Sequence, residues 1–171
     1  LSLTVSLIKK AYGYYIPQDD LNIFHNLLVA EQDVHTSNVG WYQAGNVPDN
    51  NDSDNPPPFG PVRSPDYQYS CAAMTYGGFT DWRLPTNQEA EVMLKYLYAN
   101  SSTSYLSEYG FNAGSNYWTA TSSESDLQYA YDYNIGPSEG SFKVARRKSE
   151  TYYNRARCVR GLETFYALNY S

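Results

Sequence analysis

The C-terminal part of the chain alternates apolar and polar residues with a period of two. In the segment 127–135, "LQYAYDYNI", a Leu, three Tyr and an Ile alternate with Gln, Ala, Asp and Asn. This period is typical of a β-strand with one buried face. The segments 117–121, 141–147 and 152–159 are rich in aromatic and β-branched residues and also indicate strands. We therefore expect an antiparallel β-meander in the C-terminal part of the chain.

Apolar residues at helical spacing occur earlier in the chain. The segment 1–15 has apolar residues four, three and four positions apart, which is a heptad seam and predicts an N-terminal helix. The helix either packs on the domain or forms the end of an oligomeric stalk, because two turns alone cannot hold a coiled coil. Its apolar residues are Leu1, Val5, Ile8 and Tyr12.

A second helix is predicted after Pro17, since Gly13 and Pro17 end the first one. Asp19 or Asp20 can cap its N-terminus. Its apolar side would consist of Leu21, Phe24, Leu27 and Leu28.

The segment 39–43 predicts a strand, and the segment 46–65 is a long loop rich in Pro, Asp and Asn. Asp49, Asp52 and Asp54 in this loop could supply oxygen ligands to calcium, but their spacing does not match an EF-hand loop. We expect a solvated acidic loop rather than a metal site.

A third helix has the strongest start signal in the chain. Thr86 fits the N-cap position, Glu89 completes a capping box three residues later, and Pro85 holds the entry extended. A short helix at 71–74 is expected before it. The apolar face of the third helix would consist of Ala90, Met93, Leu94 and Leu97. Helices that come first and strands that come last predict one α+β domain.

Composition and charge narrow the class of protein. Hydrophobic residues make up 42% of the chain and charged residues 18%, which is typical of a globular domain. The 19 Tyr suit half-exposed strands and adaptable binding surfaces. The net charge of −6 argues against a general nucleic-acid-binding protein. No apolar run is long enough for a membrane span, so we expect no membrane insertion.

One segment is strongly positive although the chain as a whole is negative. The segment 143–160, "KVARRKSETYYNRARCVR", holds seven of the 12 basic residues and a single acid, Glu150. Its formal charge is +6 in a chain of net charge −6, so the rest of the chain carries −12. Such a cluster is either compensated by acids elsewhere or binds an anion.

Strand geometry predicts which of these cations face solvent. If 141–147 and 152–159 form a hairpin, a three-residue turn at 149–151 keeps the charges apart from the apolar face. The apolar face then consists of Phe142, Val144, Ala156 and Cys158, together with Arg146. The opposite face, which we call the cationic stripe, consists of Lys143, Arg147, Tyr153, Arg155 and Arg157.

The sequence offers little for catalysis. His25 and His35 are isolated, and we interpret both as structural. Cys71 and Cys158 belong to no CxxC or Cys/His cluster and are either two buried thiols or a disulfide. The sequence has no glycine-rich phosphate loop and no metal signature. We expect no cofactor, no metal site and no enzymatic activity.

Three motifs in order resemble those of a known bacterial family. They are "GGFTDWRLPTNQEAE" at 77–91, "YWTATSSE" at 117–124 and "RCVRG" at 157–161. The combination is similar to the family typified by the C-terminal domain of the Legionella collagen-like adhesin, and the similarity runs from about 39 to 161. Trp82, Arg83, Pro85 and Thr86 of the first motif read as scaffold residues, because an aromatic anchor and a helix start fix a strand-to-helix junction.

The resemblance implies a C-type-lectin-like domain over 16–171 with two or three helices, preceded by the helix at 1–15. It implies a secreted or bacterial cell-surface protein that is a trimer on a collagen-like stalk and binds sulfated glycosaminoglycan. On this basis we predict a disulfide between Cys71 and Cys158, and a homotrimer assembled partly through Leu1, Val5, Ile8 and Tyr12.

The same resemblance favours an anionic polysaccharide as the partner of the basic segment. The cationic stripe would bind it, with Arg146, Lys148 and Arg160 as secondary contacts, since the planar guanidinium suits oxyanions. Two alternatives stay open: a hypervariable, Tyr-rich module that binds a protein, and a structural tip domain without a glycan ligand.

Overall fold

The computed structural model of the chain describes residues 17–45, 70–98, 109–126, 128–136, 141–148 and 153–161. For residues 42, 43, 141–144, 147 and 153 it describes the backbone alone. The expectations for the segment 1–15 and for the acidic loop 46–65 lie outside these residues. The homotrimer built on Leu1, Val5, Ile8 and Tyr12 therefore stays a prediction.

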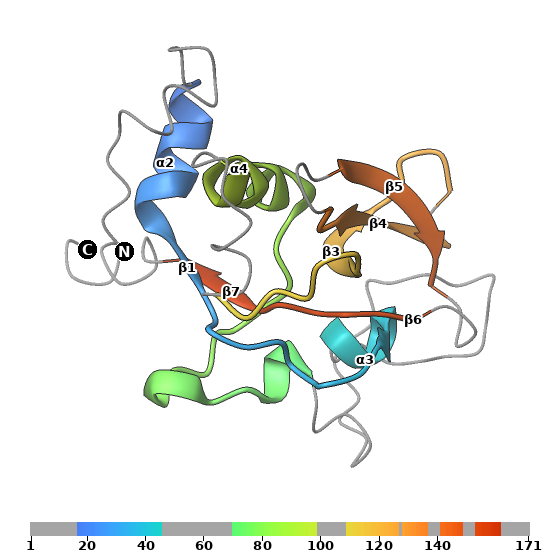
Figure 1. Cartoon of the computed structure of the whole chain (residues 1–171), viewed down its shortest axis with the longest axis horizontal. Helices are drawn as coiled ribbons and strands as arrows, with labels where there is room; N and C mark the ends of the chain where they lie inside the picture. Colours follow the sequence, from blue (N-terminus) through green and yellow to red (C-terminus); the bar gives the residue numbers. More distant parts are fainter. Residues whose placement is uncertain are drawn as a thin grey trace.

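The described residues form an α+β fold with antiparallel sheets (Figure 1). The α-helices are α2 (Gln18–Asn26), α3 (Trp41–Gly45) and α4 (Asn87–Tyr98), and two short 3-10 helices are η2 (Cys71–Ala73) and η3 (Tyr76–Gly78). The main sheet has the order β3-β4-β5 and consists of β3 (Asn116–Ser122), β4 (Tyr129–Asn134) and β5 (Ser141–Arg147). Two smaller pairs join β1 (Leu27–Val29) to β7 (Val159–Gly161), and β2 (Val39–Gly40) to β6 (Tyr153–Asn154).

The segment 153–161 is the centre of this strand pairing. Its two strands pair with β1 and β2, which come from near the start of the described chain, and Figure 1 shows β1 and β7 side by side. Two single bridges attach it to further segments, at Arg83 opposite Val159 and at Tyr117 opposite Arg155. One short piece of backbone thus holds four other segments together.

This arrangement corrects the predicted hairpin of 141–147 and 152–159. The segment 141–147 is a strand as expected, but it pairs with β4. The segment 152–159 is split, because the backbone amide of Arg155 donates to Asn116 O at 2.9 Å and Arg155 O accepts from the amide of Trp118 at 2.9 Å. Its hydrogen-bonding groups are therefore used by β3 and not by β5.

Two other predicted elements differ in extent. The second helix is present, but Pro17 occupies the N-cap and the helix ends at Asn26, so Leu27 and Leu28 lie in β1. The tertiary pairing of β1 with β7 overrides the helical spacing of these two leucines. The predicted strand 39–43 is limited to β2, after which the chain turns into α3.

A β-bulge interrupts the pairing of β4 with β5. The register shifts between Asp132 and Tyr133, where β5 contains one additional residue. The alternation along β4 itself continues, and both of its faces are covered. Ala130 packs in the cluster that contains Trp118, whereas Tyr133 and Ile135 pack against α4. Asp132 and Tyr133 are therefore both buried although they are adjacent.

The helix α4 follows the prediction closely. Thr86 Oγ1 accepts from the amide of Glu89 at 3.1 Å, and Glu89 Oε1 accepts from the amide of Thr86 at 2.8 Å, which is a capping box. The predicted apolar face is buried and packs against the β3–β4 sheet and a neighbouring aromatic. These core residues are Ala90, Met93, Leu94, Leu97, Phe111, Tyr117, Tyr133 and Ile135.

A second core cluster surrounds three tryptophans. Trp41, Trp82 and Trp118 are buried, and the indole N–H of Trp118 donates to Val39 O at 2.8 Å. The indole of Trp41 donates to Thr119 O at 2.9 Å, which ties α3 to β3. Trp82 is therefore the core anchor that the sequence motif indicates.

The predicted disulfide joins this core to the C-terminal segment. Cys71 and Cys158 are fully buried and bonded, with their Cα atoms 5.4 Å apart and a sequence separation of 87. The link ties η2 directly to the start of β7, next to the strand pairing that organises the fold.

Removing this disulfide should destabilise the domain strongly. A Cys71→Ala/Cys158→Ala variant should lose about 4 kcal/mol of unfolding free energy, because the bond restricts a long loop in the unfolded chain. Urea denaturation measures this loss. Titration of the unfolded, unreduced parent protein should find no free thiol, and two free thiols would contradict the bond.

Candidate functional site

Three aspartates pair with four arginines of the basic segment, so that each aspartate binds one or two of them. Asp33 pairs with Arg155 and Arg157, Asp81 with Arg160, and Asp132 with Arg146. The three acids come from a loop, from the motif at 77–91 and from β4, so distant parts of the chain converge on the basic segment.

Arg157 is the most enclosed of these cations, and its side chain is 0% exposed. Its Nε and Nη2 donate to Asp33 Oδ1 at 3.0 and 2.8 Å. Its Nη1 donates to the backbone oxygens of Ala30 at 2.9 Å and Tyr109 at 2.6 Å. The guanidinium also lies 4.0 Å from the centroid of the Phe111 ring. Each guanidinium nitrogen therefore has a partner, which a buried charge requires.

The second oxygen of Asp33 collects two further donors. Arg155 Nη1 donates to Asp33 Oδ2 at 3.0 Å, and the hydroxyl of Tyr117 donates to the same oxygen at 2.9 Å. The amide of Asn112 donates to the Tyr117 hydroxyl at 2.9 Å. Burial, together with the nearby Asp33, raises the pKa of Tyr117, so it remains a neutral donor to the carboxylate.

Arg160 and Asp81 form a second pair near the surface. Arg160 Nε and Nη2 donate to the two carboxylate oxygens of Asp81 at 2.7 and 3.2 Å. The hydrogen bond from Arg160 lowers the pKa of Asp81. The other side of the guanidinium contacts Phe79, whose ring centroid lies 3.6 Å away.

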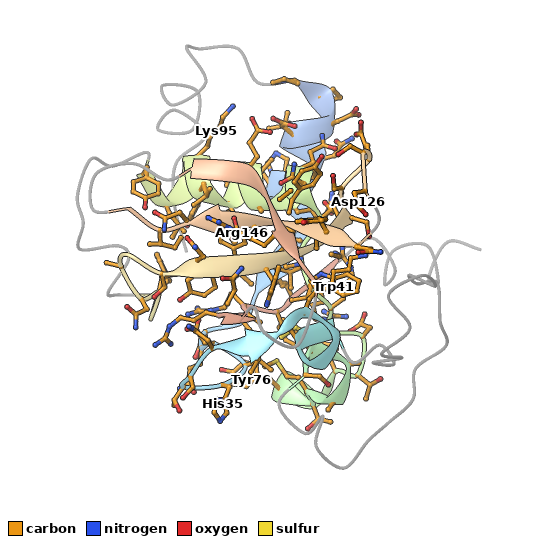
Figure 2. All side chains as sticks on the ribbon, turned by 90° about the vertical axis from the view of Figure 1, so that its right-hand side faces the viewer. His35, Trp41, Tyr76, Lys95, Asp126 and Arg146 are labelled. Atoms are coloured by element: carbon orange, nitrogen blue, oxygen red, sulfur yellow. A yellow bond between two sulfur atoms is a disulfide. The ribbon has the colours of Figure 1, made fainter. Side chains whose placement is uncertain are left out.

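Arg146 and Asp132 form a third pair on the main sheet. Arg146 Nε donates to Asp132 Oδ2 at 3.1 Å, and the side-chain Nδ2 of Asn154 donates to the same oxygen at 3.0 Å. Burial raises the pKa of Asp132 in spite of Arg146. The side chain of Arg146 is 33% exposed, so this cation reaches solvent, and Figure 2 shows it on the main sheet.

Lys148 is buried, and no carboxylate of the described residues contacts it directly. Its Nζ donates to Ser122 Oγ at 2.6 Å and lies 4.2 Å from the centroid of the Trp41 ring. Burial lowers the pKa of Lys148 to about 8. Its hydrogen bond and its aromatic contact tie the end of β5 to β3 and α3.

These positions correct the predicted cationic stripe. Arg157, Arg160 and Lys148 are buried, so the expectation that Arg157 faces solvent is wrong. Arg155 and Arg157 do lie together, but around Asp33 and not on an open face. Compensation by acids, the alternative that the sequence left open, accounts for the described arginines of the segment.

The remaining members of the stripe are placed through their backbone. Lys143 and Arg147 lie on β5, where Arg147 is opposite Tyr129, and Tyr153 lies on β6. Their side chains are outside the described part of the structure. Sequence reasoning missed Asp33, Asp81 and Asp132, and of these only Asp81 lies within a recognised motif.

The described residues do not indicate metal binding, because no group of three or more His, Cys, Asp or Glu within them could hold a metal ion. His35 Nδ1 accepts a hydrogen bond from the amide of Ser37 at 3.0 Å, which is a local contact. No helix in the described part of the chain is long and apolar enough to cross a membrane.

Comparison with protein families shows a match to the Lcl C-terminal domain over residues 31–160. The chain belongs to the Lcl C-terminal domain family. This confirms the resemblance drawn from the three motifs. The matched range begins two residues before Asp33 and ends at Arg160, so it contains all three aspartate–arginine groups. Membership in the Lcl C-terminal domain family indicates an adhesin-type domain and a surface location. A search of curated proteins finds no match.

Asp33→Asn should destabilise the domain severely. The change leaves the buried Arg157 without its carboxylate, and breaking a buried pair in this way costs about 3 to 5 kcal/mol. Glu91→Gln is the matched control, because it makes the same chemical change in the surface pair with Lys95 and should cost about 0.5 kcal/mol or less. Equal urea midpoints for the two variants would contradict a structural role for Asp33.

Lys148 should make stability depend on pH in the alkaline range. Its folded-state pKa of about 8 lies below the ordinary value of 10.5, so the folded protein releases this proton first. Stability should therefore rise, through this group, between pH 8 and pH 10.5. Lys148→Met should lack this rise, whereas Lys95→Met on α4 should keep it. Parallel stability curves for the parent and Lys148→Met would contradict the assignment.

Proposed function

We propose that this chain is the ligand-binding domain of a bacterial surface adhesin, that it has a C-type-lectin-like fold and no catalytic activity, and that its ligand is an anionic polysaccharide. Family membership supports the adhesin role. The buried disulfide supports an oxidising environment outside the cytoplasm. Assembly into a homotrimer would place several copies of a weak site on one polymer and raise the avidity.

The cations of β5 are the ones that we assign to the ligand. Lys143, Arg146 and Arg147 lie on this strand, which contains no acidic residue. In the described residues β5 pairs with β4 on one side and forms the edge of the main sheet. The solvent exposure of Arg146 is the observation that carries this choice, since Arg157 and Arg160 are enclosed.

A protein ligand is the second candidate. Tyr129 and Tyr131 of β4 are half-buried, and they are opposite Arg147 and the exposed Ala145 of β5. A surface of tyrosine beside arginine also suits protein recognition. The two candidates differ in their dependence on salt, because a polyanion releases counterions when it binds.

Removing two charges from β5 should weaken heparin binding without unfolding the domain. A Lys143→Gln/Arg147→Gln variant should elute from a heparin column at lower salt than the parent. The slope of log affinity against log salt should fall by about one per cation removed. Lys9→Gln/Lys10→Gln is the control, because it removes the same charge from outside the range that the family matches.

Two outcomes would count against this function. If the parent protein does not bind heparin at low salt, the proposal of an anionic ligand is wrong. Equal weakening by the β5 variant and the control would show attraction by net charge alone, without a site on β5.

A further inference from the structure

The loop at 75–81 exposes aromatic side chains that the proposed polysaccharide site does not use. Tyr76 is 52% exposed and Phe79 is 41% exposed. With Leu28, at 38%, they are the large hydrophobic residues that the described part of the chain leaves exposed. Exposed apolar side chains need no explanation when they are scattered, but they mark a binding site when they gather.

Leu28 and Phe79 lie beside Arg160, and Tyr76 lies in the same turn as Phe79. Leu28 is directly opposite Arg160 in the pairing of β1 and β7, and residues in this relation lie on the same face of a sheet. The guanidinium of Arg160 covers one side of Phe79. Tyr76 is joined to the same loop because the indole of Trp82 donates to Tyr76 O at 3.0 Å and the two rings are 6.2 Å apart.

The loop is fixed in this shape before any ligand arrives. Gly77 and Gly78 have φ angles of 67° and 80°, which favour glycine, and a Cβ on Gly77 would lie 3.3 Å from Phe79 Cδ2. The amide of Gly78 donates to Thr75 O at 3.0 Å, and the amide of Phe79 donates to Tyr76 O at 3.3 Å. Because the aromatic residues are already positioned, a ligand loses little affinity to ordering the loop.

Carboxylates stand at both ends of the aromatic surface. Glu31 Oε2 accepts from the hydroxyl of Tyr76 at 2.9 Å, and Asp81, which is 44% exposed on its side chain, is held by Arg160. Glu31, Asp81 and Arg160 together carry a formal charge of −1, so this surface repels a polyanion. A stable protein interface, in contrast, buries about 800 Å² on each partner, and its core is depleted of charged residues.

We propose that Tyr76 and Phe79, with Glu31 and Asp81, form a second binding site, for the ring of an uncharged sugar. The C–H face of a pyranose carries partial positive charge and packs on the negative face of an aromatic ring. Its hydroxyls donate to the remaining lone pairs of the two carboxylates. The small apolar area fits one or two sugar rings.

This site is separate from the β5 cations. In Figure 1 the green segment that contains η3 lies on the opposite side of the view from β5. In Figure 2, Tyr76 lies at the lower edge of the molecule and Arg146 lies on the main sheet. The two sites can therefore be tested independently.

Native affinity electrophoresis tests the proposal, with gels that contain one of four uncharged polysaccharides: dextran, starch, galactomannan or laminarin. The parent protein should be retarded in at least one gel. Adding about 0.5 M salt, which screens surface charges beyond a few Å, should leave this retardation unchanged. Tyr76→Ala/Phe79→Ala should lose it. Tyr14→Ala/Tyr15→Ala, outside the range that the family matches, is the matched control and should keep it.

A second variant protects the test against misfolding, because Phe79 also packs against Arg160. Tyr76→Ala alone leaves that contact in place and should reduce the retardation several-fold, with the thermal midpoint of the parent. Absence of retardation in all four gels overturns the proposal, and so does full retardation of the double variant. A fall in oligomer mass of the Tyr76→Ala variant by light scattering would also overturn it, since the surface would then contact a second copy of the chain.

Discussion

The rest of the structure depends on a single buried ion pair between Asp33 and Arg157. Taking the two charges out of water costs several kcal/mol per ion, and only good geometry and complete hydrogen bonding offset this cost. The structure meets both requirements, since Asp33 Oδ1 accepts two bonds from Arg157 and the third guanidinium nitrogen donates to two backbone oxygens. Any movement of Asp33 would leave an unpaired charge inside, so the loop at 30–38 is fixed in position.

Backbone hydrogen bonds on either side of Asp33 connect the ion pair to the strand pairing. The amide of Ala30 donates to Cys158 O at 2.9 Å, and the amide of Val34 donates to Ala156 O at 2.9 Å, on either side of Asp33. The disulfide adds Cys71 at the same point of the segment 153–161. The ion pair, the backbone hydrogen bonds and the disulfide therefore all hold the segment 153–161. The contacts of this segment reach nearly the whole described chain. Pairings this distant in sequence are slow to form, which makes the covalent link valuable during folding as well as afterwards.

The same geometry separates structural charge from functional charge. Arg155, Arg157 and Arg160 are paired with the carboxylates of Asp33 and Asp81, although they belong to the basic segment of the sequence. The cations that we assign to the ligand lie on β5, an edge of the main sheet among the described residues, and one of them, Arg146, also pairs with Asp132. An acidic protein can in this way present a local cationic strand, because attraction to a polyanion at short range depends on the charges within about 10 Å rather than on the net charge.

The sequence by itself determined the features that depend on neighbours along the chain. The capping box of Thr86 and Glu89, the apolar face of α4, the strand at 141–147 and the family motifs are all local patterns, and the structure contains them. The pairing of Cys71 with Cys158 followed from the family and not from the spacing. Only the tertiary structure decided which cations are buried. Asp33 lies 124 residues before Arg157, and the sequence around each residue does not indicate that the two form a pair. It also decided that the segment 153–159 is shared among four partner segments, since strand alternation predicts a face but not the neighbour that covers it.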